Sequence, residues 1–407
     1  MGDILFLAHR VPFPPDRGDK IRAFNILRYL SRHKRVHLIA FADDPADLKH
    51  RNGLAKVTAS REIVWRGKGQ AAAGIQALAA RRPFSLTAFD NPELRNAGAS
   101  ARGQRSVDTI YVFSGQMAQY LPAKRRQRVV MDFVDMDSAK FATYGKTTRG
   151  FTGWMMRREA RMLAQFEKSV AAKADASLFV SEAEAELFRE RTGAGRVHAV
   201  ENGIDTVKFD PAAPFARIEA VAPLLVFTGQ MDYRPNVEGV IWFAESVFPH
   251  IRVRHPDAQF AIVGRKPDAA VQALAKIEGV TVTGEVPDVR PWLAAASVVV
   301  APLKLARGVQ NKVLEAMAMA RPVVASPAAA TGIDHGGTIE IGEGVGGMAD
   351  AVNAMIADPA RAVELGVSAR QRVIDLYGWD AKLSALDPIM GFGKGRSDPQ
   401  PRSRAAA

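Results

Sequence analysis

The sequence predicts an α/β protein built from two doubly wound domains. Short apolar runs alternate with longer amphipathic stretches, which is the pattern of a parallel sheet covered by helices on both faces. The pattern runs once through the first half of the chain and restarts after a stretch rich in proline and alanine at 205–223. A length of 407 residues fits two domains, and 47% apolar residues exclude disorder of the whole chain.

Each half of the chain predicts its own series of elements. In the first half we expect strands at 4–8, 35–41, 109–113, 129–133, 176–180 and 197–200, and helices at 18–32, 115–121, 154–174 and 182–191. In the second half we expect strands at 224–228, 259–263, 280–283, 298–301, 323–325 and 338–341, and helices at 236–254, 267–277, 289–296, 310–320, 346–357 and 359–376. The domains are therefore predicted at 1–205 and 206–376, followed by a closing helical segment at 377–392 and a disordered tail at 393–407.

The excess of basic over acidic residues lies entirely in the first half. Residues 1–205 hold 34 basic and 22 acidic residues, a net charge of 34 − 22 = +12, whereas the remaining residues hold 21 of each. Such an excess predicts an anionic partner for the first half: nucleic acid, an acidic membrane surface or a phosphorylated substrate. An ordinary solvated surface is the alternative.

Several classes of protein are excluded. The chain has no cysteine, which excludes disulfides, thiolate metal sites and a cysteine nucleophile. No apolar run approaches the roughly 20 residues that a membrane-spanning helix needs. The first residues lack the basic start of a signal peptide and are predicted to form a buried strand. We therefore expect a cytoplasmic protein, either free or resting at the inner face of the plasma membrane.

The loop after the first strand is a candidate anion site. Three prolines stiffen it, and Gly18 opens a helix whose N–H groups could hold a phosphate. Arg17, Lys20 and Arg22 add positive charge and are candidate contacts for an acceptor or its phosphate. The loop matches neither a Walker motif nor the glycine fingerprint of dinucleotide-binding domains. An ordinary capped helix start is the alternative.

Two further segments of the first half carry functional side chains. Asp135 and Asp137 follow a predicted strand in a loose D-x-D pattern, which leaves open a metal, a polar cleft role or plain loop structure. Residues 149–168 combine Phe, Trp and Met with arginines. That composition suits a segment lying on anionic lipid, and equally a core helix with a charged outer face.

The residues that follow the predicted strands of the second half indicate a nucleotide-binding site. Gly229 would let a ligand approach the backbone, and Arg234 and Arg265 could pair with phosphate. Lys312 and Glu315 lie three residues apart, and hence on one helix face, just after Gly308. A cation for phosphate beside a carboxylate for ribose hydroxyls is what a nucleoside diphosphate requires.

These motifs resemble the family 4 glycosyltransferases, which are retaining enzymes of the GT-B fold. The resemblance covers residues 3–390 and is carried by Asn202-Gly-Ile-Asp, Gly229…Pro235-Asn, Val263-Gly-Arg, Gly284-Glu-Val-Pro-Asp and Lys312-Val-Leu-Glu-Ala-Met-Ala. It implies two Rossmann-like domains facing across a cleft. The opening loop and the stretch at 132–138 look most like bacterial exopolysaccharide sugar transferases, including those associated with PEP-CTERM/exosortase systems.

The resemblance implies a nucleotide-sugar donor held mainly by the second domain, a lipid-linked or glycan acceptor, and neither a metal nor a cofactor. Arg307 stands where the family often has a first glutamate, so Gly308 and Asn311 are expected to take over the contact with the sugar. Asp135, Asp137 and Gly308 are the catalytic candidates. The closing segment resembles the family's helix that crosses back onto the first domain. The donor-binding candidates are Gly18, Gly229, Arg234, Arg265, Val282, Gly308, Asn311, Lys312, Val313 and Glu315.

Two other functions remain as alternatives. A nucleotide-sugar epimerase can have the same fold and would need acid and base groups, for which His9 is available. A nucleic-acid-binding protein would use the basic half, but the sequence lacks aromatic residues interleaved with the charge and any known binding module. We therefore expect a nucleotide sugar, and not nucleic acid, as the partner.

Overall fold

The computed structural model describes residues 2–49, 53–67, 69–220, 222–306 and 309–393. The chain divides into two compact units, one of residues 1–202 with the segment from 383 onward, and one of residues 203–382. The boundary lies three residues before the predicted one. The closing segment is not one helix: it holds α17 (Trp379–Leu383) and α18 (Leu386–Met390), and the second of these belongs to the first unit.

The first unit contains a parallel sheet of seven strands in the order β3-β2-β1-β4-β5-β6-β7. Every pairing along it is parallel, which confirms the predicted doubly wound topology. The edge strand β3 was not predicted, because charged residues interrupt its apolar pattern. The strands are β1 (Asp3–Ala8), β2 (Val36–Ala42), β3 (Ser60–Trp65), β4 (Val107–Phe113), β5 (Arg128–Val134), β6 (Ala176–Phe179) and β7 (Val197–Ala199).

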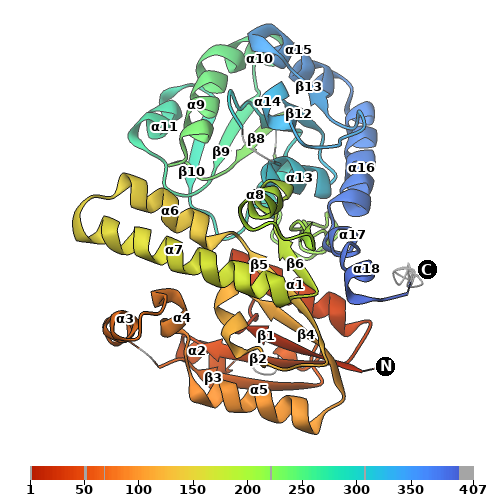
Figure 1. Cartoon of the computed structure of the whole chain (residues 1–407). Coiled ribbons are helices and arrows are strands. Elements are labelled where there is room, and N and C mark those ends of the chain that lie inside the picture. The colour runs from red at the N-terminus through yellow and green to blue at the C-terminus, as the bar shows by residue number, and fades with distance from the viewer. Residues whose placement is uncertain (1, 50–52, 68, 221, 307–308, 394–407) are drawn as a thin grey trace. The chain divides into compact units, whose positions relative to one another are not determined.

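Helices connect these strands, and several of them were not predicted. The predicted helix at 154–174 begins earlier and pairs with another helix to form a long hairpin, α6–α7 (Figure 1). The helices are α1 (Gly18–Ser31), α2 (Pro45–Lys49), α3 (Gln70–Ala79), α4 (Phe84–Ala88), α5 (Pro92–Gln104), the 3-10 helix η2 (Gly115–Tyr120), α6 (Asp137–Thr147), α7 (Gly150–Lys173) and α8 (Glu182–Thr192).

The second unit contains a parallel sheet of six strands in the order β10-β9-β8-β11-β12-β13. All six were predicted. Numbered within the unit, this order is 3-2-1-4-5-6, that of the dinucleotide-binding Rossmann fold. The strands are β8 (Leu224–Thr228), β9 (Gln259–Val263), β10 (Val280–Gly284), β11 (Val298–Ala301), β12 (Val323–Ala325) and β13 (Glu340–Ile341).

One long helical run of the second unit contains a local irregularity with a clear cause. One helix was predicted at 236–254, and in the structure the run from 234 to 254 is interrupted by a π-helical turn, η3 (Phe243–Val247). Pro249, two residues after this turn, has no N–H to donate to a carbonyl four residues earlier, so the regular hydrogen-bond ladder cannot continue. The helices of the unit are α9 (Arg234–Trp242), α10 (Phe248–Arg254), α11 (Ala269–Ala273), the 3-10 helix η4 (Leu274–Lys276), α12 (Arg290–Ala295), α13 (Asn311–Ala318), α14 (Pro327–Ala330), α15 (Gly344–Ala357) and α16 (Pro359–Leu376).

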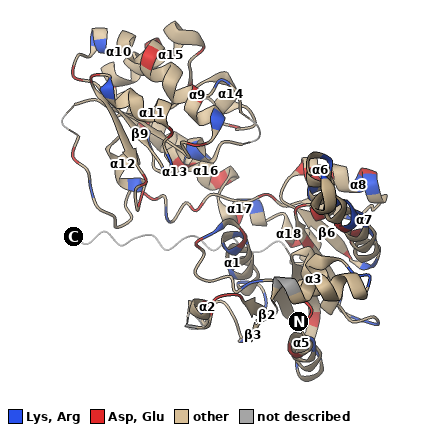
Figure 2. Ribbon diagram, turned by 90° about the vertical axis from the view of Figure 1, so that its left-hand side faces the viewer, with Lys and Arg blue, Asp and Glu red and all other residues tan. Residues whose placement is uncertain are grey.

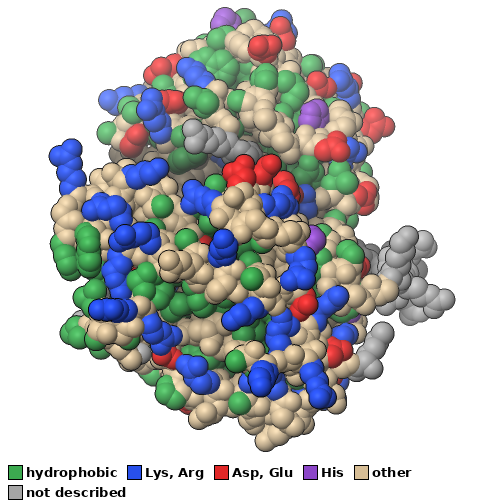
Figure 3. Space-filling model, in the orientation of Figure 1, with side chains coloured by type: hydrophobic (Ala, Val, Ile, Leu, Met, Phe, Trp, Pro, Cys, Tyr) green, Lys and Arg blue, Asp and Glu red, His purple; other side chains and the backbone are tan. Residues whose placement is uncertain are grey.

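The two units also differ in surface charge. Lys and Arg side chains are spread over the helices of the first unit on the face that Figure 3 shows, and acidic side chains gather there mainly at α8. The ribbon of Figure 2, seen from another side, has basic residues on α7 and α8. No helix within the described residues is both long and apolar enough to cross a bilayer.

Candidate functional site

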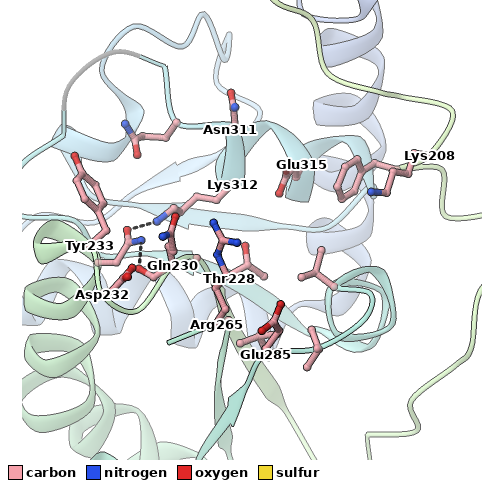
Figure 4. A pocket seen from close by; sticks show the side chains of 18 of the residues that line it. Lys208, Thr228, Gln230, Asp232, Tyr233, Arg265, Glu285, Asn311, Lys312 and Glu315 are labelled. Carbon is pink, nitrogen blue, oxygen red and sulfur yellow. Dashed lines mark hydrogen bonds between the residues drawn. The ribbon is translucent and has the colours of Figure 1, made fainter. Parts of the chain in front are cut away.

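A pocket of about 920 Å³ opens at the carboxyl ends of the strands of the second unit. Its wall is formed by the loops after β8, β9 and β10 and by the beginning of α13 (Figure 4). The strand order reverses between β8 and β11, so the connections on either side of this point run in opposite directions and leave a crevice. The lining residues are Lys208, Phe209, Thr228, Gly229, Gln230, Asp232, Tyr233, Asn236, Val263, Gly264, Arg265, Glu285, Val286, Val289, Val309, Gln310, Asn311, Lys312 and Glu315.

Lys312 is held in place inside this pocket. Its ammonium donates to Asn236 Oδ1 and lies 4.3 Å from the centroid of the Phe227 ring. Asn236 is itself oriented by donating to the carbonyl of Gln230 at 2.8 Å. Burial lowers the pKa of Lys312 to about 8, although the nearby Glu315 carboxylate opposes the shift. The structure thus presents a positioned cation whose charge is poorly solvated and is available to an anionic ligand.

Glu315 lies one helical turn further along α13 and faces the same hollow (Figure 4). Burial raises its pKa to about 7, against the attraction of Lys208 and Lys312. Its carboxylate is therefore easily protonated near neutral pH. When ionised, it can accept hydrogen bonds from hydroxyl groups of a bound ligand.

The floor of the pocket is backbone, because two glycines pack against each other there. A Cβ on Gly264 would lie 1.6 Å from the carbonyl oxygen of Gly229. A Cβ on Gly229 would lie 2.8 Å from Asn236 Nδ2 and 3.2 Å from Lys312 Nζ. Any side chain at Gly229 would therefore disturb the contact that positions Lys312, and the predicted approach of a ligand to the Gly229 backbone stays a prediction.

A buried hydroxyl beside these glycines has no partner. Thr228, the last residue of β8, is 4% exposed, and its Oγ1 makes no hydrogen bond within the described residues. A buried polar atom without a partner costs free energy, about 1–3 kcal/mol, unless a ligand or water supplies the bond. Because Thr228 also lines the pocket, its hydroxyl is a natural contact for a bound molecule.

The pocket brings together only some of the predicted donor-binding residues. Gly229, Arg265, Asn311, Lys312 and Glu315 all line it. Arg265 is exposed and enters the hollow from the loop after β9 (Figure 4).

Other predicted donor residues lie elsewhere. Arg234 is outside the pocket: its side chain is 87% exposed and pairs with Glu238 at 2.7 Å, because both stand on the outer face of α9. Val313 is buried in the core of the second unit and does not line the pocket. Val282 packs against the core from within β10 rather than lining the pocket. Gly308 and Arg307 lie outside the described residues.

Several residues that line the pocket were not predicted to belong to the site, among them Lys208, Thr228, Gln230 and Asn236. Thr228 ends a strand, so the rule that ligands lie beyond strand ends could have indicated it. Asn236 stands in a recognised motif, but only the folded chain shows that its amide orients Lys312. Lys208 comes from the segment after the first unit, and its place beside Glu315 depends on tertiary packing.

In the first unit, the three cations predicted to meet an acceptor or phosphate already have protein partners. Arg17 donates to Asp19 at 2.8 Å, and the ammonium of Lys20 is buried against Asp47 at 2.9 Å. Partial burial would raise the pKa of Asp19, but hydrogen bonds from His9 and Arg10 hold it well below its usual range.

Arg22 also has protein partners. It is 1% exposed and donates to Asp132, to the Val200 carbonyl at 2.8 Å and to Asn202 at 2.9 Å. These pairings correct the prediction for Lys20 and Arg22, because the charge of each is buried and paired within the first unit. The side chain of Arg17 is 57% exposed, and its contact with an acceptor or a phosphate stays a prediction. Gly18 begins α1 with open space around its Cα, and its contact with a donor stays a prediction.

Asp135 and Asp137 follow β5, as predicted, in two different environments. Asp135 is exposed, whereas burial raises the pKa of Asp137, which accepts from Gln116 at 3.2 Å. Val134, just before them, has a φ of 72°, which is rare and strained for a β-branched residue. Such strain is common at functional sites. Within the described part of the chain, no cluster of three or more His, Asp or Glu could hold a metal ion.

The pKa values of the pocket predict how binding depends on pH. We expect a nucleotide sugar to bind best between about pH 7 and 8. Below pH 7 the carboxylate of Glu315 becomes protonated and loses acceptor capacity, and above pH 8 Lys312 loses its positive charge. Calorimetric titration from pH 5.5 to 9.5 measures this dependence, since the diphosphate of a nucleotide sugar does not itself titrate there. Glu315→Gln should abolish the loss of affinity below pH 7 and leave the loss above pH 8. An unchanged loss of affinity below pH 7 in this variant would contradict the assignment of Glu315 to the binding site.

Comparisons with known proteins agree with this geometry. Residues 222–358 match the family model described as glycosyl transferases group 1. Alpha-maltose-1-phosphate synthase of Mycolicibacterium smegmatis is 32% identical over 223 residues, which is 45% of this chain and 54% of that protein, so the chain spans about half the length of this curated relative. The solved structure of Anabaena Alr3699/HepE with UDP and glucose has a TM-score of 0.57 at 15% identity, covering 96% and 100% of the two chains. WaaG, a glycosyltransferase of lipopolysaccharide biosynthesis, has a TM-score of 0.54 at 16% identity, covering 95% and 100%.

Proposed function

We propose, from a glycosyl transferases group 1 domain at residues 222–358 within a GT-B fold, that this protein is a retaining family 4 glycosyltransferase. It would move a sugar from a nucleoside diphosphate sugar to an acceptor. The observation that carries the proposal is the pocket of the second unit, in which a positioned lysine, a buried carboxylate and a bare glycine backbone meet. The match with the group 1 domain covers the same residues.

Each part of the pocket has a role in this reaction. Lys312 and Arg265 would neutralise the diphosphate, both in the bound donor and as it gains charge on leaving. Glu315 would accept hydrogen bonds from the ribose hydroxyls. Gly229 would let the phosphates approach the backbone, and Asn311, together with Gly308, would contact the sugar.

The reaction would need no metal if the cationic side chains of the pocket neutralise the leaving diphosphate. Lys312, Arg265 and Lys208 line the pocket, and the first turn of α13 adds the partial positive charge of a helix N-terminus. Asp135 and Asp137 are then proposed as polar groups of the first unit that serve the acceptor or the donor sugar. Burial raises the pKa of Asp137, and a perturbed carboxyl group of this kind is typical of functional sites.

We propose a lipid-linked or glycan acceptor in bacterial exopolysaccharide or cell-envelope synthesis, of the PEP-CTERM-associated type, used at the cytoplasmic side of the membrane. The excess positive charge of the first half supports an anionic acceptor or an anionic surface near it. The epimerase alternative gains no support from the comparisons, since the matched family model is one of glycosyl transferases.

A thermal-shift screen against UDP-, GDP-, ADP- and dTDP-sugars tests the proposal. A donor present at 100 times its Kd stabilises the protein by about 2.7 kcal/mol, which raises the Tm by about 5–10 °C. We expect one base to give a clear shift, and product analysis with that donor to show slow hydrolysis or transfer with retention. If no nucleotide sugar shifts the Tm, or if only an epimerised donor is formed, the proposal is wrong.

A further inference from the structure

Five large apolar side chains are exposed on one part of the first unit. Phe151 is 71% exposed and stacks on Trp154, with 5.7 Å between ring centroids, at the beginning of α7. Tyr144 is exposed at the end of α6, and Ile75 (73% exposed) and Leu78 lie on α3. We call these five residues the apolar surface of the α6–α7 hairpin and α3.

The two elements that carry this surface are neighbours. Arg158 of α7 donates to the backbone carbonyls of Ala77 and Arg82, at the end of α3 and just beyond it. Figure 1 shows α3 and the hairpin on the same side of the first unit, and both face the viewer in Figure 2. Hydrophobic side chains gather at this edge in Figure 3, with Lys and Arg side chains around them.

The exposed charge around the apolar surface has a single sign. From 138 to 173 the sequence holds two carboxylates, Glu159 and Glu167, and both are buried. Glu159 accepts from the backbone of Phe84 and Ser85, and Glu167 from Ser138, so neither offsets a cation at the surface. Helix α3 has no charged residue at all. The basic residues of the hairpin are Lys140, Lys146, Arg149, Arg157, Arg158, Arg161, Lys168 and Lys173.

We propose that this surface docks the first unit on a bilayer that contains anionic lipid. Phe151, Trp154 and Tyr144 would enter the headgroup region, where aromatic rings are favoured, and Ile75 and Leu78 would add apolar area. Lys146 and Arg149, at the turn between the two helices, would meet lipid phosphates. Nucleic acid fits less well, because an uncharged helix and a stacked aromatic pair gain nothing from a phosphate backbone.

The proposal names the surface by which the protein would reach the membrane in the proposed function, and it does not depend on sugar transfer. All residues that carry it belong to the first unit, whereas the donor pocket belongs to the second. Donor binding measured by thermal shift and lipid binding measured by sedimentation can therefore fail separately.

Cosedimentation of the full chain with vesicles of phosphatidylcholine, with and without 30% phosphatidylglycerol, tests the proposal. We expect binding to the anionic vesicles alone, weakened by salt. The double variant F151S/W154S should bind at least tenfold more weakly, and K146E/R149E more weakly still, since each cation near the surface contributes about fivefold. The matched control V363S/V367S changes two exposed apolar residues of α16 and should bind like the unchanged protein.

Three results would overturn the proposal. One is the absence of binding to anionic vesicles. Another is equal binding of F151S/W154S and V363S/V367S, which would remove the hairpin from the interaction. The third is salt-sensitive binding of an oligonucleotide that is lost in F151S/W154S and K146E/R149E, together with no lipid binding, which would assign the surface to nucleic acid. Circular dichroism of each variant shows whether its fold is intact.

Discussion

Replacing Lys312 by methionine is expected to lower kcat/KM for the nucleotide sugar by about 10²–10³-fold. The methionine keeps an apolar stem against the Phe227 ring but removes the charge that the diphosphate would meet. Because the leaving group gains negative charge as the sugar bond breaks, the loss should be larger in kcat/KM than in the Kd for the donor. Steady-state kinetics and calorimetry with the donor found in the thermal-shift screen measure both quantities.

The same variant should fold normally. Burial lowers the pKa of Lys312, which means that its charged form is unfavourable in the folded protein without a ligand, so Lys312→Met should leave the Tm unchanged or raise it. Lys276→Met, an exposed residue of the same unit, is the matched control and should retain full activity. Kinetics of Lys312→Met within twofold of the unchanged protein would refute the assignment of the pocket.

Replacing Arg22 by alanine is expected to destabilise the first unit by about 3–5 kcal/mol. The change would leave Asp132, which is fully buried, without the guanidinium that now lies 3.0 Å from it. Tyr111 would remain as a donor to Asp132 at 2.9 Å, but a neutral hydroxyl cannot balance a buried carboxylate. The hydrogen bonds from Arg22 to Val200 and Asn202, which hold the end of the first unit, would be lost as well.

Urea denaturation followed by hydrogen exchange in α1 and β5 measures this effect in the unit concerned. Arg17→Ala is the control, because it removes an exposed ion pair on the same helix start and should cost less than about 1 kcal/mol. Equal stability of the Arg22 and Arg17 variants would mean that the buried pair contributes little. The variant R22M/D132L removes both charges and should recover part of the loss.

The strands and helices that were predicted from the sequence are those in which the spacing of apolar residues matches the side chains that are buried in the structure. All six strands of the second unit were predicted, and the central ones, such as β8 (Leu224–Thr228) and β11 (Val298–Ala301), are buried apolar runs. Strand β3 was missed because it lies at the edge of its sheet, where Arg61 and Glu62 interrupt the pattern that a central strand shows. Helix α3 was missed because its alanine-rich sequence has no polar face to mark a helical period.

The predicted site residues that lie together in the structure are those chosen for their place after a strand or on one helix face, and their roles in binding stay predictions. Gly229, Lys312 and Glu315 are such residues, and they line one pocket. Predictions from charge alone were less successful. Lys20 and Arg22 are basic residues in a candidate loop, but their partners, Asp47 and Asp132, are 27 and 110 residues away, and no local pattern indicates that they pair.

The sequence was enough to predict the two parallel sheets, the strand ends beyond which a ligand would lie and the excess of positive charge in the first half. These properties follow from the spacing of apolar residues, from glycine and helix-start motifs a few residues long, and from composition, all of which are local or additive. The partner of each cation could be seen only in the folded structure. Lys312 is positioned through Asn236, whereas Arg22 is neutralised in the interior, because the free energy of a charge depends on its burial and on partners that folding brings from distant parts of the chain.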